Sequence, residues 1–379
     1  MLKECVKILE KGKPNGNQMV VRFHLPSGLD ILGLPTENFY GGEWDLGPTW
    51  NYFVQTDQPF LVDAGRHGTG KALLETMEKA GVSRGDLKCV VLSHGHEDHD
   101  GGLFEIVQAT GAKVKAHWVY DRLIRSYPDQ APLDADDKRD FPASCWHCFM
   151  PESFRAANCL AYHQERYQLK VEEIGDGNGD LFEGVRTFHL PGHSPDALAI
   201  LVGEEALIVG DTVLPDITPF PTREAFFSQV AHILEPRCSG GPALYGLAAY
   251  IGSLRSLEKI AGDYPNLLVL PAHRLYYKEQ WNEIELTGRI AELISHHVDR
   301  CSDILEILKS GPKNAREIAV AHFDPDRLKG VGIMMAENEI LSHMELLMAA
   351  GDIQPLEDAR FRATGSTGFE SLINATKNG

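Results

Sequence analysis

Three histidines and three acidic residues fall within seven positions, in the stretch HGHEDHD at residues 94–100. His94, His96, Asp98 and His99 have the spacing H-x-H-x-D-H and directly follow an apolar run. Alternate side chains of an extended segment point the same way, so His94 and His96 can converge on one point. A turn after them would direct Asp98 and His99 to a neighbouring point. Imidazole and carboxylate groups are typical metal ligands, so the stretch predicts metal binding.

Four further residues of these chemical types also end apolar runs. His193 ends TFHLPGH, Asp211 ends ALIVGD, and His273 ends LLVLPAH. Because α/β proteins place their sites at the carboxyl ends of strands, we expect these three residues to join the motif. Asp63, which ends the run FLVD, is expected to steady a ligand or the motif loop. Metal-bound imidazoles usually donate their other N–H to such a group.

The elements that must position these residues alternate between strands and helices, which predicts an α/β layered core. Apolar periodicity and glycine signals predict helices over 69–81, 101–111 and 244–261. Regular β-structure is expected over 170–190, with the Gly-Asn-Gly at 177–179 as a hairpin turn. The other predicted strands are 19–25, 50–56, 59–65, 87–93, 113–118, 197–203, 206–211 and 266–273.

Residues 119–170 lack a clean period, and we expect an inserted lid or subdomain there. The insert contains Cys145, Cys148, Cys159 and His163, with the spacing C-x2-C-x10-C-x3-H. Three thiolates and an imidazole suit a structural zinc site. The favoured alternative is that these are small buried residues, as free cysteines commonly are. Outside these candidates, His24, His117 and His189 are expected to pack or to cap. The histidines on predicted helices are expected to lie on solvated or packed faces.

After about residue 280 the pattern becomes helical, with amphipathic helices expected within 302–311, 314–323 and 337–354. Three short helices of this kind are typical of a winged-helix module. Acidic residues outnumber basic ones from residue 300 onward. An acidic module of this type favours packing or dimerisation over the reading of DNA.

The composition of the 379 residues narrows the function classes. A net charge of −18 disfavours nucleic-acid partners, although it does not rule them out. No apolar stretch approaches the roughly 20 residues of a membrane helix, and the start of the chain has no secretory pattern. Seven cysteines, an odd number, fit a reducing compartment better than a disulfide framework. We therefore expect a cytoplasmic protein with a small-molecule substrate and no membrane partner.

The motif and the later ligand candidates resemble the metallo-β-lactamase superfamily over about residues 15–280. The helical tail is most similar to its branch with a winged helix, the glyoxalase II and β-lactamase-like protein group. The resemblance implies an αββα sandwich over 1–282 with a 119–170 lid, a winged-helix-like domain over 283–360, and a tail over 361–379. It implies one metal on His94, His96 and His193, a second on Asp98, His99 and His273, and Asp211 bridging both.

The same resemblance implies a hydrolase that uses a hydroxide bridging two divalent metals. Zinc is the expected metal, and iron and manganese suit the donor set as well. Asp98 would orient the nucleophile or accept its proton. Antibiotic-cleaving members use a cysteine in the second metal site where this chain has Asp211, so β-lactamase activity is not expected. The favoured substrate is a small thioester or ester. The alternatives are a metal-dependent ribonuclease or phosphodiesterase and, less favoured, a non-enzymatic metal-bound scaffold.

Overall fold

A computed structural model describes residues 2–38, 45–125, 160–234, 237–238, 240–330 and 332–375. These residues form two compact units that are not contiguous in sequence. The first unit comprises Met1–Leu190, Asp196–Pro219 and Ala261–Glu285, and the second comprises Pro191–Pro195, Phe220–Ile260 and Leu286–Gly379. The domain ranges predicted above stay a prediction. The two units differ from them, because the second unit also includes residues 191–195 and 220–260. Within the described ranges, no helix has the length and apolarity needed to cross a membrane.

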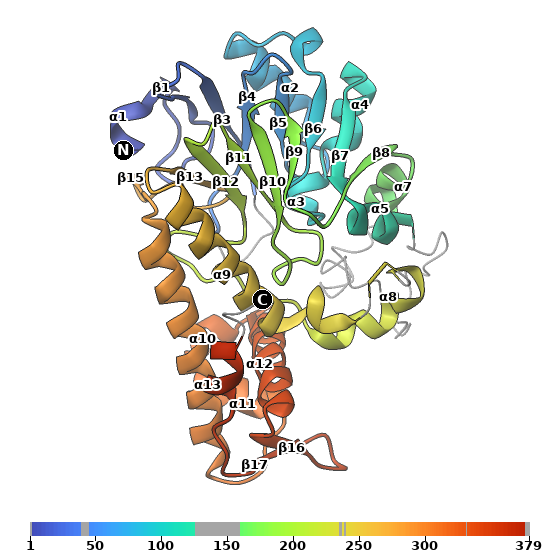
Figure 1. The fold of residues 1–379 in the computed structure, drawn as a ribbon, viewed down its shortest axis with the longest axis vertical. Coiled ribbons are helices and arrows are strands. Elements are labelled where there is room, and N and C mark those ends of the chain that lie inside the picture. Colours follow the sequence, from blue (N-terminus) through green and yellow to red (C-terminus); the bar gives the residue numbers. More distant parts are fainter. Residues whose placement is uncertain are drawn as a thin grey trace. The chain divides into compact units, whose positions relative to one another are not determined.

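The first unit contains a sheet of eight strands that follow one another in chain order (Figure 1). Neighbouring strands pair antiparallel from β1 to β5 and parallel from β5 to β8. Every residue of β4, β5 and β6 is buried, because both faces of the central strands are covered. The strands are β1 (Val6–Glu10), β2 (Val20–His24), β3 (Asp30–Thr36), β4 (Thr49–Val54), β5 (Phe60–Val62), β6 (Cys89–Val91), β7 (Lys113–His117) and β8 (Val171–Ile174).

A second sheet in the same unit has the order β13-β12-β11-β10-β9, with only β12 and β13 parallel. Its strands are β9 (Gly179–Phe182), β10 (Val185–His189), β11 (Leu198–Val202), β12 (Ala206–Gly210) and β13 (Leu268–Pro271). A small hairpin, β14 (Tyr276–Tyr277) with β15 (Gln280–Trp281), follows them.

The hairpin predicted at Gly-Asn-Gly is wrong. β8 pairs with β7 in the eight-stranded sheet, whereas β9, which begins at Gly179, pairs with β10 in the other sheet. Gly177 and Asn178 therefore lie in a connection between two sheets. The hairpin turn lies one strand later, between β9 and β10. Gly184 supplies the left-handed backbone there, with φ of +71°. A local glycine signal marks a change of direction but not the pairing partner of the next strand.

Two apolar clusters hold these layers together. One joins the facing sides of the two sheets, with Phe23, Trp50 and Val91 from the larger sheet and Ile200 and Leu270 from the smaller. The other packs helices against the far side of the larger sheet. The helices of the first unit are α1 (Leu2–Cys5), α2 (Gly70–Lys79), η1 (Arg84–Asp86), α3 (Glu97–Asp100), α4 (Leu103–Thr110), α5 (Trp118–Arg125) and α7 (Leu160–Tyr167). The described ends of the predicted lid are therefore helical, as α5 and α7.

The second unit is mainly helical and has its own core, which includes Ile290, Ile318, Ile340 and Met344. Asn314 begins α11 with a reciprocal capping box to Glu317. Lys313 forms an antiparallel bridge with Phe361, one residue before that cap. Its elements are η4 (Glu224–Phe226), α8 (Phe227–Leu234), η5 (Gly241–Ala243), α9 (Gly246–Asp263), α10 (Leu286–Leu308), α11 (Ala315–His322), η6 (Pro325–Leu328), α12 (Gly332–Ala349), β16 (Ile353–Pro355), β17 (Phe361–Ala363) and α13 (Phe369–Ala375).

Candidate metal centre

The candidate ligands of the first unit follow the ends of its strands. His94 and His96 lie between β6 and α3, and Asp98 and His99 lie on the single turn of α3. Asp211 directly follows β12, and His273 follows β13 by two residues. The neighbouring parallel strands β12 and β13 end at the same edge of their sheet, which brings Asp211 and His273 together.

Asp63, immediately after β5, holds His99 and the start of the motif loop. His99 donates from Nδ1 to Oδ2 of Asp63 at 2.8 Å. The backbone amide and the hydroxyl of Ser93 donate to the two oxygens of Asp63 at 2.7 and 2.8 Å. With Nδ1 protonated and engaged, Nε2 of His99 is left as the ligand atom, the arrangement that metal-bound histidines usually have.

His273 is oriented in the same manner by a backbone group. Its Nδ1 donates to the carbonyl oxygen of Pro48 at 3.2 Å. Its Nε2 then lies 3.1 Å from an oxygen of Asp98 and 3.4 Å from one of Asp211. The Nε2 atoms of His99 and His273 are buried and have no hydrogen bond of acceptable geometry. Ligand atoms of Asp98, His99 and His273 lie within 4.8 Å of one another, as do those of His94, His99 and Asp211.

The electrostatics of this cluster favour a cation. Burial alone would lower the pKa of His99, but the carboxylates of Asp98 and Asp211 raise it well above its usual value. Burial opposes the same change at His273, yet Asp211 and Asp98 raise its pKa to about 9. Burial would raise the pKa of Asp98, and His99 and His273 instead hold it below the usual range. Two carboxylates that face two imidazole nitrogens therefore fit the donor set of a divalent metal.

Two residues that sequence reasoning did not find hold Asp98 in place. The side-chain amide of Asn38 donates to Oδ2 of Asp98 at 2.9 Å, and the hydroxyl of Thr49 approaches the same oxygen at 3.4 Å. Both are buried. Thr49 begins β4, so its position follows from the sheet, whereas Asn38 lies after β3 with no motif around it. No signal in the sequence links either residue to Asp98.

His94 and His96 meet through different ring nitrogens. Nε2 of His94 lies 3.0 Å from Nδ1 of His96, with the rings nearly perpendicular at 77°. The hydroxyl of Ser93 lies 3.0 Å from Nδ1 of His94. His94 is buried and His96 is half-buried. The two imidazoles therefore converge on one point, as the alternation of an extended segment predicts.

His193 lies in the loop Pro191–Pro195, between β10 and β11, which groups with the second unit. Its Nδ1 lies 3.1 Å from the carbonyl oxygen of Phe220, to which it can only donate. Nε2 is then the ligand atom, as for His99 and His273. Its place in a metal site stays a prediction.

The two other acids of the motif, Glu97 and Asp100, are buried rather than exposed to solvent. Glu97 is 4% exposed and accepts the backbone amide of His67 at 2.9 Å. Asp100 is 2% exposed and accepts hydroxyl groups from Tyr120 at 2.9 Å and Tyr162 at 2.6 Å. These acids tie α3 to its surroundings rather than adding negative charge at the surface.

Gly101 and Gly102 allow the backbone to approach neighbouring segments closely. Both have ordinary right-handed helical backbones, with φ of −63° and −84°. A Cβ atom on Gly101 would lie 2.1 Å from the backbone nitrogen of His67, and one on Gly102 would lie 2.3 Å from the carbonyl oxygen of Ala64. The missing side chains let α3 and α4 pack against the loop after β5.

The candidate zinc site of the insert falls largely outside the described residues. Cys145, Cys148 and Cys159 are not among them. His163 lies on α7, is 1% exposed, and packs against the ring of Tyr162 at 4.9 Å between centroids. The zinc interpretation therefore stays a prediction.

A further group of metal-ligand types lies at the ends of β7, β8 and β10, where His117, Asp176 and His189 meet. The two imidazoles stack at 3.7 Å and 17°, so their ring planes are nearly parallel rather than turned toward one ion. The backbone amide of Val119 donates to Nδ1 of His117 at 3.4 Å, which leaves Nε2–H facing Asp176 at 3.2 Å. Trp118 also donates to Asp176. Hydrogen bonds from Trp118 and from the Val119 amide therefore hold two members of this group in place.

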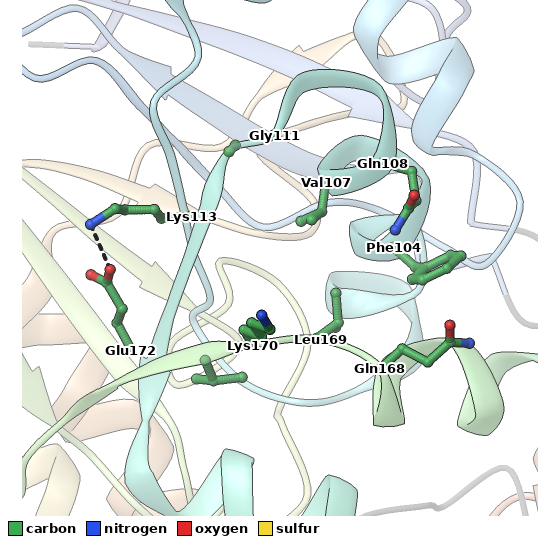
Figure 2. A pocket seen from close by; sticks show the side chains of 11 residues that line it. Phe104, Val107, Gln108, Gly111, Lys113, Gln168, Leu169, Lys170 and Glu172 are labelled. Atoms are coloured by element: carbon green, nitrogen blue, oxygen red, sulfur yellow. Dashed lines mark ion pairs between the residues drawn. The ribbon is translucent and has the colours of Figure 1, made fainter.

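A groove of about 440 Å³ lies between α4 and the segment that joins α7 to β8. Figure 2 shows the side chains that line it. Phe104, Val107 and Leu169 line it, and Lys113 and Glu172 form an ion pair of 2.7 Å at one end. The groove lies at the amino ends of β7 and β8, whereas the metal-ligand candidates follow the carboxyl ends of strands. None of the predicted site residues lines it.

The two-sheet fold and the buried His/Asp cluster define a metallo-hydrolase, and the comparison with protein families agrees. Residues 44–273 match the model of the metallo-beta-lactamase superfamily. The chain belongs to this superfamily and is a metal-dependent hydrolase.

Individual relatives are distant. The chain is 25% identical to the probable metallo-hydrolase YqjP of Bacillus subtilis (strain 168), over 80% of this chain and 89% of that protein. It is 23% identical to an atrochrysone carboxyl ACP thioesterase of Claviceps purpurea (strain 20.1), over 73% and 77%. Several other curated relatives are matched over only 20–60% of their length. A beta-lactamase domain protein from Burkholderia ambifaria shares the fold, with a TM-score of 0.63, 19% identity, and coverage of 96% and 98%.

Proposed function

We propose that the protein is a dinuclear metal hydrolase that cleaves a small thioester or ester. The observation that carries the proposal is the buried convergence of two ligand groups that share His99, one with His94 and Asp211 and one with Asp98 and His273. One cation needs three or four such ligands, and these groups supply five residues before His96 and His193 are counted. The donor set is therefore large enough for two ions.

We assign His94, His96 and His193 to one metal and Asp98, His99 and His273 to the other, with Asp211 between them. Bound divalent metals would polarise an acyl carbonyl and supply hydroxide at neutral pH. Zinc is the proposed metal, since its usual ligands are of these types.

The chain's own residues would orient the ligands and handle the proton. Asp63 and the Pro48 carbonyl fix His99 and His273 with Nε2 toward the carboxylates. Asn38 and Thr49 both approach one oxygen of Asp98, Oδ2. The other oxygen, Oδ1, is not part of these two contacts, and we propose that it orients the nucleophile or accepts its proton.

Thioesters and esters are favoured over nucleic acid for two reasons. The chain carries a net charge of −18, which repels a phosphate backbone. The relative matched over about three quarters of both chains is named as a thioesterase. Both facts support an acyl substrate.

The test is an assay of the metal-loaded protein against acyl-CoA thioesters, glutathione thioesters and single-stranded RNA. We expect thioester turnover that falls by at least ~100-fold in Asp98→Asn, because general acid–base groups typically contribute 10²–10⁴-fold. Asp57→Asn, at an exposed loop residue, is the matched control and should keep full turnover. Cleavage of RNA without thioester turnover would overturn the proposal.

For the second unit we propose a winged-helix-like module that serves packing or dimerisation. The order α10, α11, α12 and the hairpin β16–β17 supports this, together with the bridge between Lys313 and Phe361 before α11. Its acidic composition supports a protein partner, such as a second copy of the chain. Sedimentation of the full chain at several concentrations tests the dimer, and a monomer throughout would overturn it.

A further inference from the structure

The loop that carries His193, Pro191–Pro195, is held by other residues of the second unit through several contacts. The hydroxyl of Ser253 on α9 donates to the carbonyl oxygen of Pro191 at 2.6 Å. Thr222 donates to the carbonyl oxygen of Gly192 twice, from its backbone amide at 2.7 Å and its hydroxyl at 2.8 Å. His193 meets the Phe220 carbonyl at 3.1 Å. Residues 220–222 therefore form the support on which His193 rests.

Gly192 shows how closely this loop approaches α9. Its φ is +125°, a backbone that residues with a side chain rarely adopt. A Cβ atom there would lie 2.3 Å from the backbone nitrogen and Cα of Tyr250. Tyr250 is fully buried, and the atoms that a Cβ would meet are backbone atoms of the helix rather than the end of a flexible side chain. The backbone before His193 is therefore fixed directly against α9.

A carboxylate from α12 anchors the same support from its other side. Glu345 accepts the backbone amide of Glu224 at 2.6 Å and that of Ala225 at 3.3 Å. Nε of Arg223 lies 3.4 Å from the same carboxylate. These groups begin η4, one to three residues after Thr222. Glu345 is 12% exposed, so the interaction is partly shielded from water and stronger than a surface ion pair.

We propose that Glu345 is a positioning residue for the metal ligand His193. Its carboxylate fixes the start of η4, and this in turn fixes the position of Phe220 and Thr222. These two residues then determine how the His193 ring is oriented and which of its nitrogens carries the proton. Every residue in this series of contacts, from Glu345 to His193, belongs to the second unit. This inference rests on the proposed function for its effect on metal binding, but not for its effect on the His193 ring.

The first test needs no metal. In the metal-free full chain, ¹⁵N NMR of the histidine rings should show His193 with its proton on Nδ1. Glu345→Ala should shift His193 toward a mixture of both tautomers, and Glu345→Gln, which keeps one acceptor, should restore most of the Nδ1–H form. A wild-type His193 protonated on Nε2, or an unchanged ring in Glu345→Ala, would overturn the inference.

The second test measures metal affinity by competition with a chelator. Glu345→Ala should lower the affinity for one of the two zinc ions by ~10–100-fold, which is the range for residues that orient a metal ligand. The affinity for the other ion should not change. Glu337→Ala, on the same helix, removes the same charge and should bind both ions normally. Ile340→Val removes a buried methyl group without touching the support, so it lowers stability but should also bind both ions normally.

The outcomes separate the two proposals. A wild-type chain that binds no zinc contradicts the proposed function, while the NMR result still decides the role of Glu345. If Glu345→Ala binds both zinc ions with normal affinity, or if Ile340→Val weakens zinc binding as much as Glu345→Ala does, the positioning role of Glu345 is contradicted. The proposed function is not affected by either result.

Discussion

His99 and Asp63 share a hydrogen bond of 2.8 Å, and their side chains are only 0% and 2% exposed. Asp63 has a left-handed backbone, with φ of +64°, at the point where β5 ends. Asp and Asn adopt this backbone more readily than most residues, so the position selects a short polar side chain. The same side chain receives both Ser93 donors and thereby joins β5 to the motif loop.

Asp63→Asn should weaken metal binding without unfolding the protein. Asparagine tolerates the backbone, but it lacks the charge that holds His99 with Nδ1 protonated. We expect a ~10–100-fold loss of affinity for one ion, measured by chelator competition. Asp57→Asn serves as the control, and equal affinities in both variants would refute the role of Asp63.

Tyr162→Phe should destabilise the first unit. It removes a hydroxyl that donates to the buried Asp100 at 2.6 Å and accepts from Arg166 at 2.7 Å. Leaving these partners unsatisfied typically costs about 1–3 kcal/mol. Tyr167→Phe, on the same helix but 45% exposed, should change stability by less than about 0.5 kcal/mol. Urea denaturation compares the two, and equal midpoints would show that the buried network contributes nothing.

Gly101→Ala should be strongly destabilising, because its methyl group would lie 2.1 Å from the nitrogen of His67. Gly262→Ala makes the same chemical change near the end of α9, where nothing lies within 4 Å of the added atom. It should stabilise the protein by about 0.5–1 kcal/mol. Thermal unfolding of the two variants should move in opposite directions, and a neutral Gly101→Ala would contradict the close approach.

The second unit should lose stability in mild acid. Burial first, and then neighbouring His343, His296 and Arg300, lower the pKa of His297 well below 6.5. Burial lowers that of His343 to about 4. Below pH 6.5 the unfolded chain binds protons that the folded unit excludes, so the free energy of unfolding falls as the pH drops toward 4.

Hydrogen exchange of α10 and α12 at pH 7 and pH 5, corrected for intrinsic rates, measures this loss. Glu339, with a pKa lowered to about 2, remains ionised in the folded unit across this range. His297→Gln should flatten the pH dependence, whereas the exposed His232→Gln should leave it unchanged. Protection that is independent of pH in the wild type would contradict the role of the buried histidines.

The site residues that can be predicted from the sequence are those that directly follow a strand along the chain. Apolar runs that end in His94, Asp211 and His273 place their side chains at strand ends, and the structure gathers them there. The same runs predict the central strands within a few residues, because fully buried strands have continuous apolar sequences.

The rest depends on contacts between distant segments, which leave no local pattern. Asn38 reaches Asp98 across 60 positions, and Tyr162 reaches Asp100 across 62. The parallel pairing of β8 with β7 is likewise decided by the sheet rather than by its own turn. Gly101 and Gly102 pack closely against residues about 35 positions earlier, and nothing in the sequence around them indicates this contact.

The most direct test of the central claim is the metal content of the protein. The wild type and the double variant His94→Ala/His99→Ala, which lacks one ligand of each metal, are both loaded with zinc and then freed of loosely bound ions. We predict that the wild type retains two more zinc equivalents per chain than the variant. Any zinc retained by the variant would belong elsewhere, such as the cysteines of the insert. Equal zinc contents in the wild type and the double variant would contradict the dinuclear centre.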